Sequence, residues 1–557
     1  MNLKNSSFKN WIRSGVTGFF VLIFSLVALT TKFPESDILL MAGISLVLTV
    51  ISVLGLYYIL SRKNVTKDPV NWEYKGNYPF SFMVSFITIM IFSQSSPLYP
   101  FNNWVDPNCF FTVGSCVLKG LVPYRDLYEQ KGPLLYFLHT LAALISSDTF
   151  FGVFIIQVIS CSFVHFFAMK TAALYTKISR TSYIASIPLL FLSFSVISYY
   201  FGDSSEEFLF PFYSATLYII LKAIRKKIYP SVREIILIGL GAASAFWIKY
   251  TLCGYFVAVI LFLIIFGFFR KEYKKIAFAA LYFGAVCLAV SGLILLYFAT
   301  NHAVNDLFTA YFFNNLQYGE VTENVSILGR IPYTITLTFI RLADNLYFAV
   351  MILIASVVFM LKGKKGELPF YLGALFLTAL FIFMGSFQGF YYPFALAVFT
   401  IPAWSGIFIL AEKIRCLPVT VALSTGLCIC AFFLSASTPS ILSKREDMPQ
   451  YIFAEYINRS ESPTLLNYNF LDQGFYTVSG VLPTEKHFCE LNIDLVISEG
   501  AEARDAAIEQ GRVEFVVTKN EEFDWDNYEL VAYADWSEKD FDNELWSDRF
   551  YLYQRID

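Results

Sequence analysis

The chain has 557 residues, of which 56% are hydrophobic and 15% are charged, and it holds 59 phenylalanines and 35 tyrosines. A single soluble core does not need so much apolar and aromatic side chain, so the composition indicates an integral membrane protein. The formal net charge is −3 and the basic residues lie in short loops, which argues against nucleic acid as a partner. Nine cysteines without a CxxC pair and four scattered histidines indicate neither a disulfide framework nor a zinc site.

Runs of roughly 20 apolar residues are long enough to cross a hydrocarbon core of about 30 Å as helices. The first such run is expected to be a retained helix, because no small-residue cleavage site follows it. The chain is therefore predicted to be mainly α-helical, with about 13 transmembrane helices. The thirteen runs are 12–30, 37–60, 79–95, 150–170, 182–200, 207–223, 233–248, 251–269, 275–299, 346–362, 369–385, 391–411 and 417–435.

The run 133–146 is apolar but short for a span, so it is expected to lie at the membrane interface or to dip in and return. Short loops rich in Lys and Arg stay in the cytoplasm. If 133–146 does not cross, the N-terminus and all six basic loops lie on one side: 61–67, 176–180, 222–227, 270–275, 362–367 and 412–415. The other side, predicted to be extracytoplasmic, then holds the loops 96–149 and 201–207, the stretch 300–345 and the tail.

The tail 437–557 is rich in acidic residues and has no long apolar run, so it is predicted to be a small extracytoplasmic α/β domain that follows a transmembrane domain of residues 1–436. A helix is predicted over 502–511, ending at Gly511. Strand composition is found in the segments 464–470, 494–499, 513–519 and 550–555.

The loop after the run 79–95 contains WVDPNCFFTVGSCVLKGLVPYRDLYEQKGP at 104–133. Its first acid, Asp106, is expected to lie near the membrane surface, within reach of lipid headgroups. A lone acid there is usually only solvated, and a lone lysine such as Lys131 usually extends its ammonium to the surface. Here, however, the two residues belong to a longer pattern.

This pattern resembles the first periplasmic loop of the GT-C class of membrane glycosyltransferases, which includes the bacterial relatives of protein O-mannosyltransferases (glycosyltransferase family 39) and the aminoarabinose transferase of lipid A. In that class an acid after a membrane helix is followed by Gly-x-x-Pro-Tyr-x-Asp and then by Lys-x-Pro-Leu. The resemblance covers about 79–435 and implies the GT-C fold. The matching positions are Asp106, Gly120, Pro123, Tyr124, Asp126, Lys131 and Pro133.

The segment GDSSEEFLFPFYSATLYI at 202–219 resembles the second acidic loop of the class, with Glu206 as the second acid and Glu207 as the alternative. Both glutamates also suit the start of a helix, where the macrodipole favours carboxylates, and the two roles are compatible. Further family-like elements lie around Asn315 and at 387–397. In the latter the class often has a His-Tyr pair, and Gln388 or Tyr391 stands near the His position.

The resemblance implies transfer of a sugar from a polyprenyl-phosphate donor to a hydroxyl of a glycan, lipid or protein, in the cell membrane. Asp106 is the expected general base and Glu206 the second catalytic acid, while Lys131 is expected to stabilise the departing phosphate. A divalent cation such as Mg²⁺ or Mn²⁺ is compatible with two acids but is not required by them. The other residues expected to bind substrate are Tyr124, Asp126, Glu207, Asn315, Arg330 and Tyr391. Arg330 and Arg125 are the weaker candidates for contact with the phosphate.

Other functions stay open at this point. A transporter or flippase also has many helices, but it is expected to carry ionisable residues in mid-membrane, whereas the acids here gather in loops. The exception is Lys249, which is predicted to lie in a tight outer hairpin. A polymerase of an envelope glycan would share the chemistry. The sequence does not identify the sugar, the acceptor or the polyprenol length.

Overall fold

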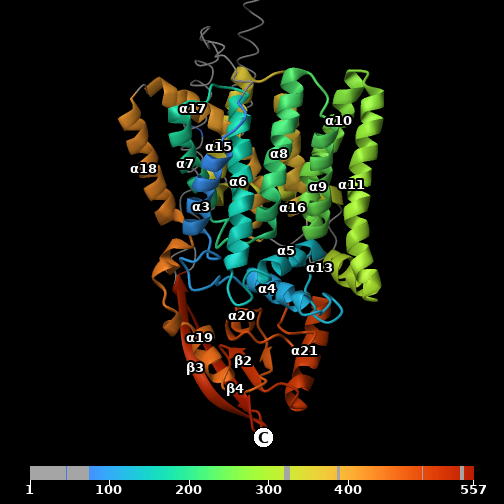
Figure 1. Cartoon of the computed structure of the whole chain (residues 1–557), viewed down its shortest axis with the longest axis vertical. Coiled ribbons are helices and arrows are strands. Elements are labelled where there is room, and N and C mark those ends of the chain that lie inside the picture. The colour runs from blue at the N-terminus through green and yellow to red at the C-terminus, as the bar shows by residue number, and fades with distance from the viewer. Residues whose placement is uncertain are drawn as a thin grey trace, which may run out of the picture.

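The computed structural model describes residues 46, 50, 74–318, 327–384, 389–414, 416–491, 494–539 and 545–556. These residues form an upright helical bundle with a small α/β domain at one end (Figure 1). The two predicted spans 12–30 and 37–60 lie outside the described residues, apart from residues 46 and 50.

Long apolar helices make up the bundle. Among the described residues, five helices are long and apolar enough to cross a membrane, or up to seven if each of two bent pairs is one span. The chain is thus a mainly helical, multi-pass membrane protein, and the count of thirteen spans stays a prediction. The bundle helices are α3 (Tyr78–Phe92), α6 (Phe151–Ala173), α7 (Arg180–Phe194), α8 (Ser205–Lys226), α9 (Val232–Ile248), α10 (Gly254–Phe269), α11 (Tyr273–Thr300), α14 (Ile327–Asp344), α15 (Leu346–Lys362), α16 (Glu367–Phe383), α17 (Ala403–Ile414) and α18 (Leu417–Leu434).

Three of these helices take part in two sharp bends. Helix α14 meets α15 at 108°, and the 3-10 helix η3 (Tyr392–Thr400) meets α17 at 47°. Pro393 lies in the first turn of η3 and Pro402 lies in the break before α17. Because proline lacks a backbone N–H and clashes with the preceding turn, the predicted span 391–411 is divided into two parts.

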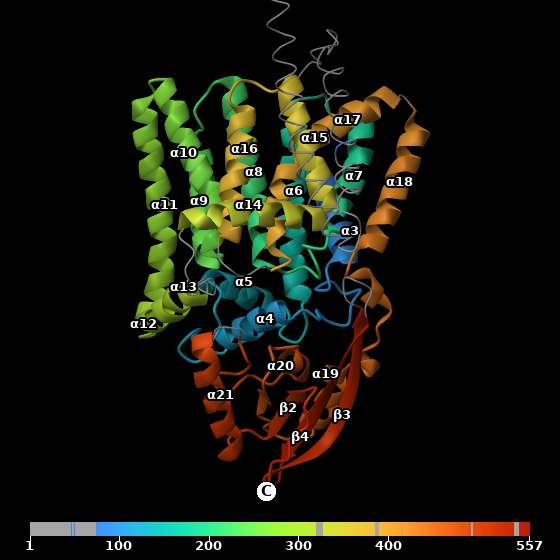
Figure 2. The ribbon, with the colours of Figure 1, turned by 180° about the vertical axis from the view of Figure 1, so that it is seen from behind.

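Two short helices, α4 (Val105–Leu118) and α5 (Pro133–Ala143), lie across the end of the bundle, between the long helices and the α/β domain (Figure 2). Helix α5 has only 11 residues, as the short apolar run 133–146 predicted. The two helices approach closely at Gly114, where an added Cβ would lie 2.6 Å from the Cβ of His139. The stretch 300–345 contributes α12 (Val304–Leu307), the π-helix η2 (Phe308–Asn314) and α13 (Asn315–Tyr318) before α14 begins.

The described basic loops lie at the end of the bundle opposite the α/β domain (Figure 1). Arg225 donates to the carbonyl oxygen of Lys362 at 2.9 Å, and its Nε lies 3.6 Å from Oε1 of Glu367. The hydroxyl groups of Ser179 and Thr181 donate to Glu412. The grouping of basic loops at one end agrees with the charge pattern, while loop 61–67 lies outside the described residues.

The α/β domain holds a four-stranded sheet of order β1-β2-β4-β3, in which β1 and β2 are parallel and the other pairs antiparallel. Three predicted strands form, but 494–499 belongs to a helix instead. That helix runs without a break into the predicted helix 502–511, because Gly500 and Ala501 do not interrupt it. The elements are α19 (Pro449–Ile457), β1 (Leu465–Asn467), α20 (Phe475–Ser479), α21 (Asp494–Glu509), β2 (Phe515–Lys519), β3 (Tyr528–Lys539) and β4 (Leu545–Arg555).

The bundle and the α/β domain share one hydrophobic core. A single cluster of buried side chains includes Phe111 and Phe154 of the bundle region together with Phe475 and Leu552 of the domain. The short helices α4 and α5 therefore lie between two packed parts, and the loops at their ends are held from both sides.

Candidate active site

Two acid–lysine pairs meet at the domain end of the bundle. Nζ of Lys131 lies 3.5 Å from Oδ2 of Asp106, and the hydroxyl of Tyr391 donates to the same oxygen at 3.1 Å. Nζ of Lys249 donates to Oε1 of Glu206 at 2.7 Å. Because this Nζ also lies 5.2 Å from the ring centroid of Tyr391, the tyrosine adjoins both pairs. These five residues are called the charged cluster below.

Helix ends position the charged cluster. Asp106 lies in the first turn of α4 and Glu206 in the first turn of α8, where the positive end of the helix dipole favours a carboxylate. Lys249 directly follows α9, where the negative end favours an ammonium. Lys131 comes two residues before α5. The capping role expected of the second acid is therefore compatible with its place in the charged cluster.

The charged cluster is largely shielded from solvent but is not closed. The side chain of Asp106 is 20% exposed and those of Lys131 and Lys249 are each 12% exposed, whereas that of Glu206 is fully buried. Oε2 of Glu206 has no hydrogen-bond partner among the described atoms. Burial lowers the pKa of Lys249 and the nearby Lys131 lowers it further, while Glu206 acts in the opposite direction. Asp106 is therefore accessible to a substrate, whereas Glu206 is buried and has one oxygen that accepts no hydrogen bond from the described atoms.

The loop before α5 is fixed by contacts to its backbone. The hydroxyl of Tyr124 donates to the carbonyl oxygen of Lys131 at 2.6 Å, and Nδ2 of Asn315 donates to that of Gln130 at 2.6 Å. The carboxylate of Glu129 accepts the N–H of Lys131 at 2.9 Å. Tyr124 and Asn315, both predicted to bind substrate, are thus placed where they hold the backbone beside the lysine.

Asp126 lies in the same loop but away from the charged cluster. Its two carboxylate oxygens each accept a hydrogen bond of 2.7 Å from Arg125, and Oδ2 also accepts the N–H of Val122 at 2.7 Å. Arg125 holds the pKa of this carboxyl below its usual range. Arg125 in turn donates to the carbonyl oxygen of Asn301 at the end of α11. These contacts join the loop to the bundle.

Glu207 has different surroundings from Glu206. Its carboxylate accepts hydrogen bonds from Nε2 of Gln157 at 2.9 Å, the hydroxyl of Tyr199 at 3.1 Å and the N–H of Asp203 at 2.7 Å. These bonds fasten the turn that precedes α8, so of the two glutamates it is Glu206 that reaches the charged cluster.

Two other predicted positions are not joined to the charged cluster by the described contacts. Arg330 is half-buried in α14, and its Nε has no hydrogen-bond partner among the described atoms. Gln388, the alternative to Tyr391, lies outside the described residues.

The sequence interpretation left out Lys249 as a site residue, although this lysine lies between two apolar runs at the end that carries the acidic loops. It also left out a buried pair that joins α5 to the turn before α8. Nε2 of His139 lies 3.1 Å from Oδ1 of Asp203, and Nδ1 lies 2.9 Å from the carbonyl oxygen of Leu135. Burial raises the pKa of Asp203, and His139 opposes this shift.

No group of three or more His, Cys, Asp and Glu side chains that could hold a metal ion is found in the part of the chain that the structure describes. Each acid of the charged cluster has a lysine ammonium within 3.5 Å. The participation of a divalent cation stays a prediction.

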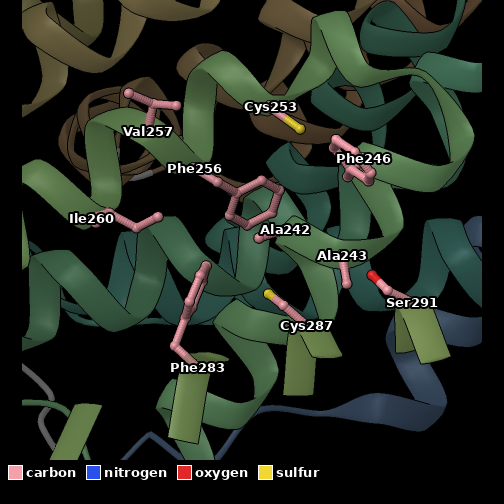
Figure 3. A pocket seen from close by; sticks show the side chains of 10 residues that line it. All are labelled: Ala242, Ala243, Phe246, Cys253, Phe256, Val257, Ile260, Phe283, Cys287 and Ser291. Carbon is pink, nitrogen blue, oxygen red and sulfur yellow. The ribbon is translucent and has the colours of Figure 1, made fainter. Parts of the chain in front are cut away.

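An apolar cavity of about 260 Å³ lies between α9, α10 and α11 (Figure 3). Cys253 lies only four residues after Lys249, so the cavity begins close to the charged cluster along the chain. Cys287 and Phe283 contribute from α11, which is one of the apolar candidate spans. The lining residues are Ala242, Ala243, Phe246, Cys253, Phe256, Val257, Ile260, Phe283, Cys287 and Ser291.

Comparison with known proteins gives two findings. Residues 130–297, which include Lys131, Glu206 and Lys249, match a family model described as dolichyl-phosphate-mannose-protein mannosyltransferase. The fold is similar to that of ArnT from Cupriavidus metallidurans, whose crystal structure is of the protein bound to undecaprenyl phosphate; the TM-score is 0.54, the identity 9%, and the match covers 86% of this chain and 97% of that chain. No curated protein matches. The two findings confirm the resemblance to GT-C membrane glycosyltransferases, and the second shows the fold.

Proposed function

We propose that this protein is a membrane glycosyltransferase that moves a sugar from a polyprenyl-phosphate donor to an acceptor hydroxyl at the extracytoplasmic face of the cell membrane. The observation that carries this proposal is the charged cluster, in which Tyr391 adjoins the partly exposed carboxylate of Asp106 and the ammonium of Lys249. A second ammonium, that of Lys131, lies 3.5 Å from the same carboxylate. The lipid phosphate bound to the structurally similar ArnT supports a polyprenyl phosphate as the ligand of this chain as well.

Asp106 acts as the base for the acceptor. Both Lys131 and Tyr391 approach Oδ2, which orients the carboxylate, so we assign Oδ1 to the acceptor hydroxyl. As the acceptor oxygen bonds to the anomeric carbon, its proton passes to Asp106 and the bond from that carbon to the phosphate oxygen breaks. The products are the glycosylated acceptor and the lipid phosphate.

The lysines stabilise the phosphate that leaves. In the resting site each ammonium is balanced by one carboxylate. When Asp106 takes the proton it loses its negative charge, while negative charge grows on the departing phosphate. Lys131 then pairs with the phosphate, which stabilises the transition state more than the ground state. Lys249 adds a second positive charge beside it.

The apolar cavity offers a place for part of the isoprenoid chain. Figure 3 shows the side chains of Phe256 and Phe283 directed toward the interior between α9, α10 and α11. Since Cys253 in the cavity wall is four residues from Lys249, a lipid with its phosphate at the charged cluster can extend its apolar chain along this side.

The test is transfer by the purified protein in liposomes that contain a sugar-labelled polyprenyl phosphate. The proposal expects labelled acceptor and free lipid phosphate to appear in equal amounts, and Lys249→Ala to lower this turnover at least tenfold. Lys119→Ala is the matched control, because this exposed lysine lies at the other end of α4. Movement of intact donor across the bilayer without loss of its sugar would contradict the proposal and favour a flippase.

A further inference from the structure

The lysine loop, residues 121–132, leads from α4 to α5 and is held against the bundle close to the charged cluster. The N–H of Gly132 donates to the carbonyl oxygen of Ile248 at 3.0 Å. An added Cβ on Gly132 would clash with the backbone of the last turn of α9, so this close approach requires glycine. Each of these two residues adjoins a lysine of the charged cluster in the chain, so the contact brings Lys131 and Lys249 together along their backbones.

The lysine loop also contacts the α/β domain, through Tyr128. Its N–H donates to the carbonyl oxygen of Lys486 at 2.8 Å. Its ring stacks on that of His487, with 5.6 Å between the ring centroids and 29° between the ring planes. Its hydroxyl accepts a hydrogen bond of 2.7 Å from Nδ2 of Asn314 at the end of η2. Tyr128 is only 6% exposed, so the domain and η2 together enclose its side chain.

His487 is buried and is itself held within the domain. Its Nε2 lies 3.8 Å from Oε1 of Glu499 in α21. The backbone of α21 approaches the same ring, because an added Cβ on Gly500 would lie 3.3 Å from Nδ1. Nη1 of the buried Arg504, also in α21, donates to the carbonyl oxygen of Cys489 at 3.2 Å. The chain around His487 is thus fixed on α21 and gives the tyrosine ring a firm support.

Glu129 connects Tyr128 to the lysine. Its Oε2 accepts the N–H of Lys131 at 2.9 Å and also accepts the hydroxyl of Tyr136 in α5. Glu129 is only 3% exposed. Because Tyr128 and Glu129 are neighbours in the chain, a shift of the tyrosine moves this carboxylate and with it the backbone that bears the ammonium group.

We infer that the α/β domain positions Lys131 for the departing phosphate, with His487 and Tyr128 as the positioning residues. This inference rests on the role of Lys131 in the proposed function. The contacts to the bundle hold the lysine beside Lys249, and the contact to the domain keeps the residues before it in place. A misplacement of about 1 Å can cost about 10²-fold in rate, so the domain acts on catalysis without touching the substrate.

Two variants of His487 separate the ring contact from other effects. Burial lowers the pKa of His487, so its ring is uncharged near pH 7 and a phenylalanine ring can replace it. His487→Ala removes the stacked ring, whereas His487→Phe keeps one. Tyr468→Ala is the matched control for lost stability of the domain. Tyr468 packs against Phe523 and Trp525 in a hydrophobic cluster that contains domain residues alone.

The first measurement is hydrogen–deuterium exchange of the full chain in detergent, followed in peptides that cover the lysine loop. The N–H groups of Tyr128 and Lys131 are both hydrogen-bonded, so they exchange slowly while the contact holds. Their exchange should be at least about tenfold faster in His487→Ala and close to wild type in His487→Phe and Tyr468→Ala.

Equal exchange in His487→Ala and the wild type would overturn the inference. An increase of the same size in Tyr468→Ala would overturn it as well, because the stability of the domain, and not the ring contact, would then control the lysine loop.

The second measurement is a double-mutant cycle on transfer from the sugar-labelled polyprenyl phosphate in liposomes. His487→Ala should lower the transfer rate at least about tenfold, and His487→Phe should keep most of it. In the Lys131→Ala background the change of His487 to alanine should have little further effect, because the lysine that it positions is absent.

Equal losses in the two backgrounds would overturn the positioning role. Exchange does not depend on sugar transfer, so the two proposals fail separately. A chain that transfers no sugar but shows the expected exchange refutes only the proposed function. An active chain in which the two losses are independent refutes only the positioning of Lys131 by the domain.

Discussion

The two acid–lysine pairs of the charged cluster differ in the distance between the charged atoms and in the exposure of the acid. The pair of Lys249 and Glu206 is 2.7 Å long, in the range of a strong charged hydrogen bond, and the acid is fully buried. The pair of Lys131 and Asp106 is 3.5 Å long and its acid is 20% exposed. A substrate can displace Lys131 from Asp106 more easily than Lys249 from Glu206. We therefore assign base catalysis to Asp106, and we assign electrostatic support to the pair of Lys249 and Glu206.

Asp106→Asn should abolish most of the transfer. Asparagine keeps the size of the side chain but does not take a proton at neutral pH, and base catalysis contributes about 10²- to 10⁴-fold. Single-turnover sugar transfer should fall by that range while binding of the donor lipid stays close to wild type. The control is Asp148→Asn, an exposed acid in the loop after α5. If the folded Asp106→Asn variant transferred sugar at a near-normal rate, Asp106 would not be the general base but only a solvated acid.

Lys131→Ala should impair use of the donor far more than Lys131→Arg. The proposed role is a positive charge against phosphate, which arginine keeps and alanine removes. The measurement is the dependence of transfer rate on donor concentration for the two variants, with Lys119→Ala for comparison. If the alanine variant matched the wild type, Lys131 would be a lysine that only extends to the membrane surface.

At the scale of elements, the interface between α4 and the α/β domain contains a titratable group in Asp472, which accepts a hydrogen bond from Thr112 of α4. Burial raises the pKa of this carboxyl to about 6, although Thr112, the N–H of Gly474 and Asn467 all donate to it. The pKa of Asp472 is therefore higher in the folded protein than in the unfolded chain, where it is about 4. Between about pH 4 and pH 6 the unfolded chain has already lost this proton while the folded protein still holds it. The contribution of Asp472 to the free energy of unfolding thus falls as pH rises through this range.

Asp472→Asn removes this titration while keeping an acceptor for the hydroxyl of Thr112. The thermal unfolding midpoint of the variant, minus that of the wild type, should therefore increase as pH rises from about 4 to about 6. Above that range the difference between the two midpoints should stay constant. Unfolding scans in detergent across this pH interval test the expectation, with Asp148→Asn as the exposed control. Parallel pH curves for the Asp472 variant and the wild type would contradict it.

Elements with uninterrupted apolar sequence were predictable, and those that depend on distant contacts were not. The run 346–362 coincides with α15, and 233–248 lies within one residue of α9. Helix α14 escaped prediction because Arg330, Arg341 and several threonines interrupt its apolar residues. Strand β3 is rich in acids and alanine, and it forms by pairing with β4.

The charged cluster was predictable only in part. The motif identified Asp106, Lys131 and Glu206, because each lies in a local pattern. The contacts that unite them join Tyr391 to Asp106 over 285 positions and Lys249 to Glu206 over 43. No local spacing encodes such contacts, since they arise only when the first turns of α4 and α8, the end of α9 and the start of η3 come together in the fold.

At the scale of the whole molecule, the basic loops and the α/β domain occupy opposite ends of the bundle (Figure 1). The positive-inside rule places the basic end in the cytoplasm, so the domain and the charged cluster are predicted to face outward. Protease added to spheroplasts should remove the tail after residue 437 and leave the loop 362–367 intact, as followed with tags at these positions. Protection of the tail, with the loop cleaved, would reverse the orientation.

The hydrophobic core shared by the bundle and the domain has a consequence for cooperativity. Buried side chains such as Phe111 and Phe475 belong to one cluster, so separating the two parts exposes apolar surface on both. Partial melting of the domain alone is thereby made costly, and heat should unfold both parts in a single calorimetric transition. A chain truncated after residue 436 would therefore expose the apolar surface of the bundle that the domain now covers. Such a chain would be prone to self-association.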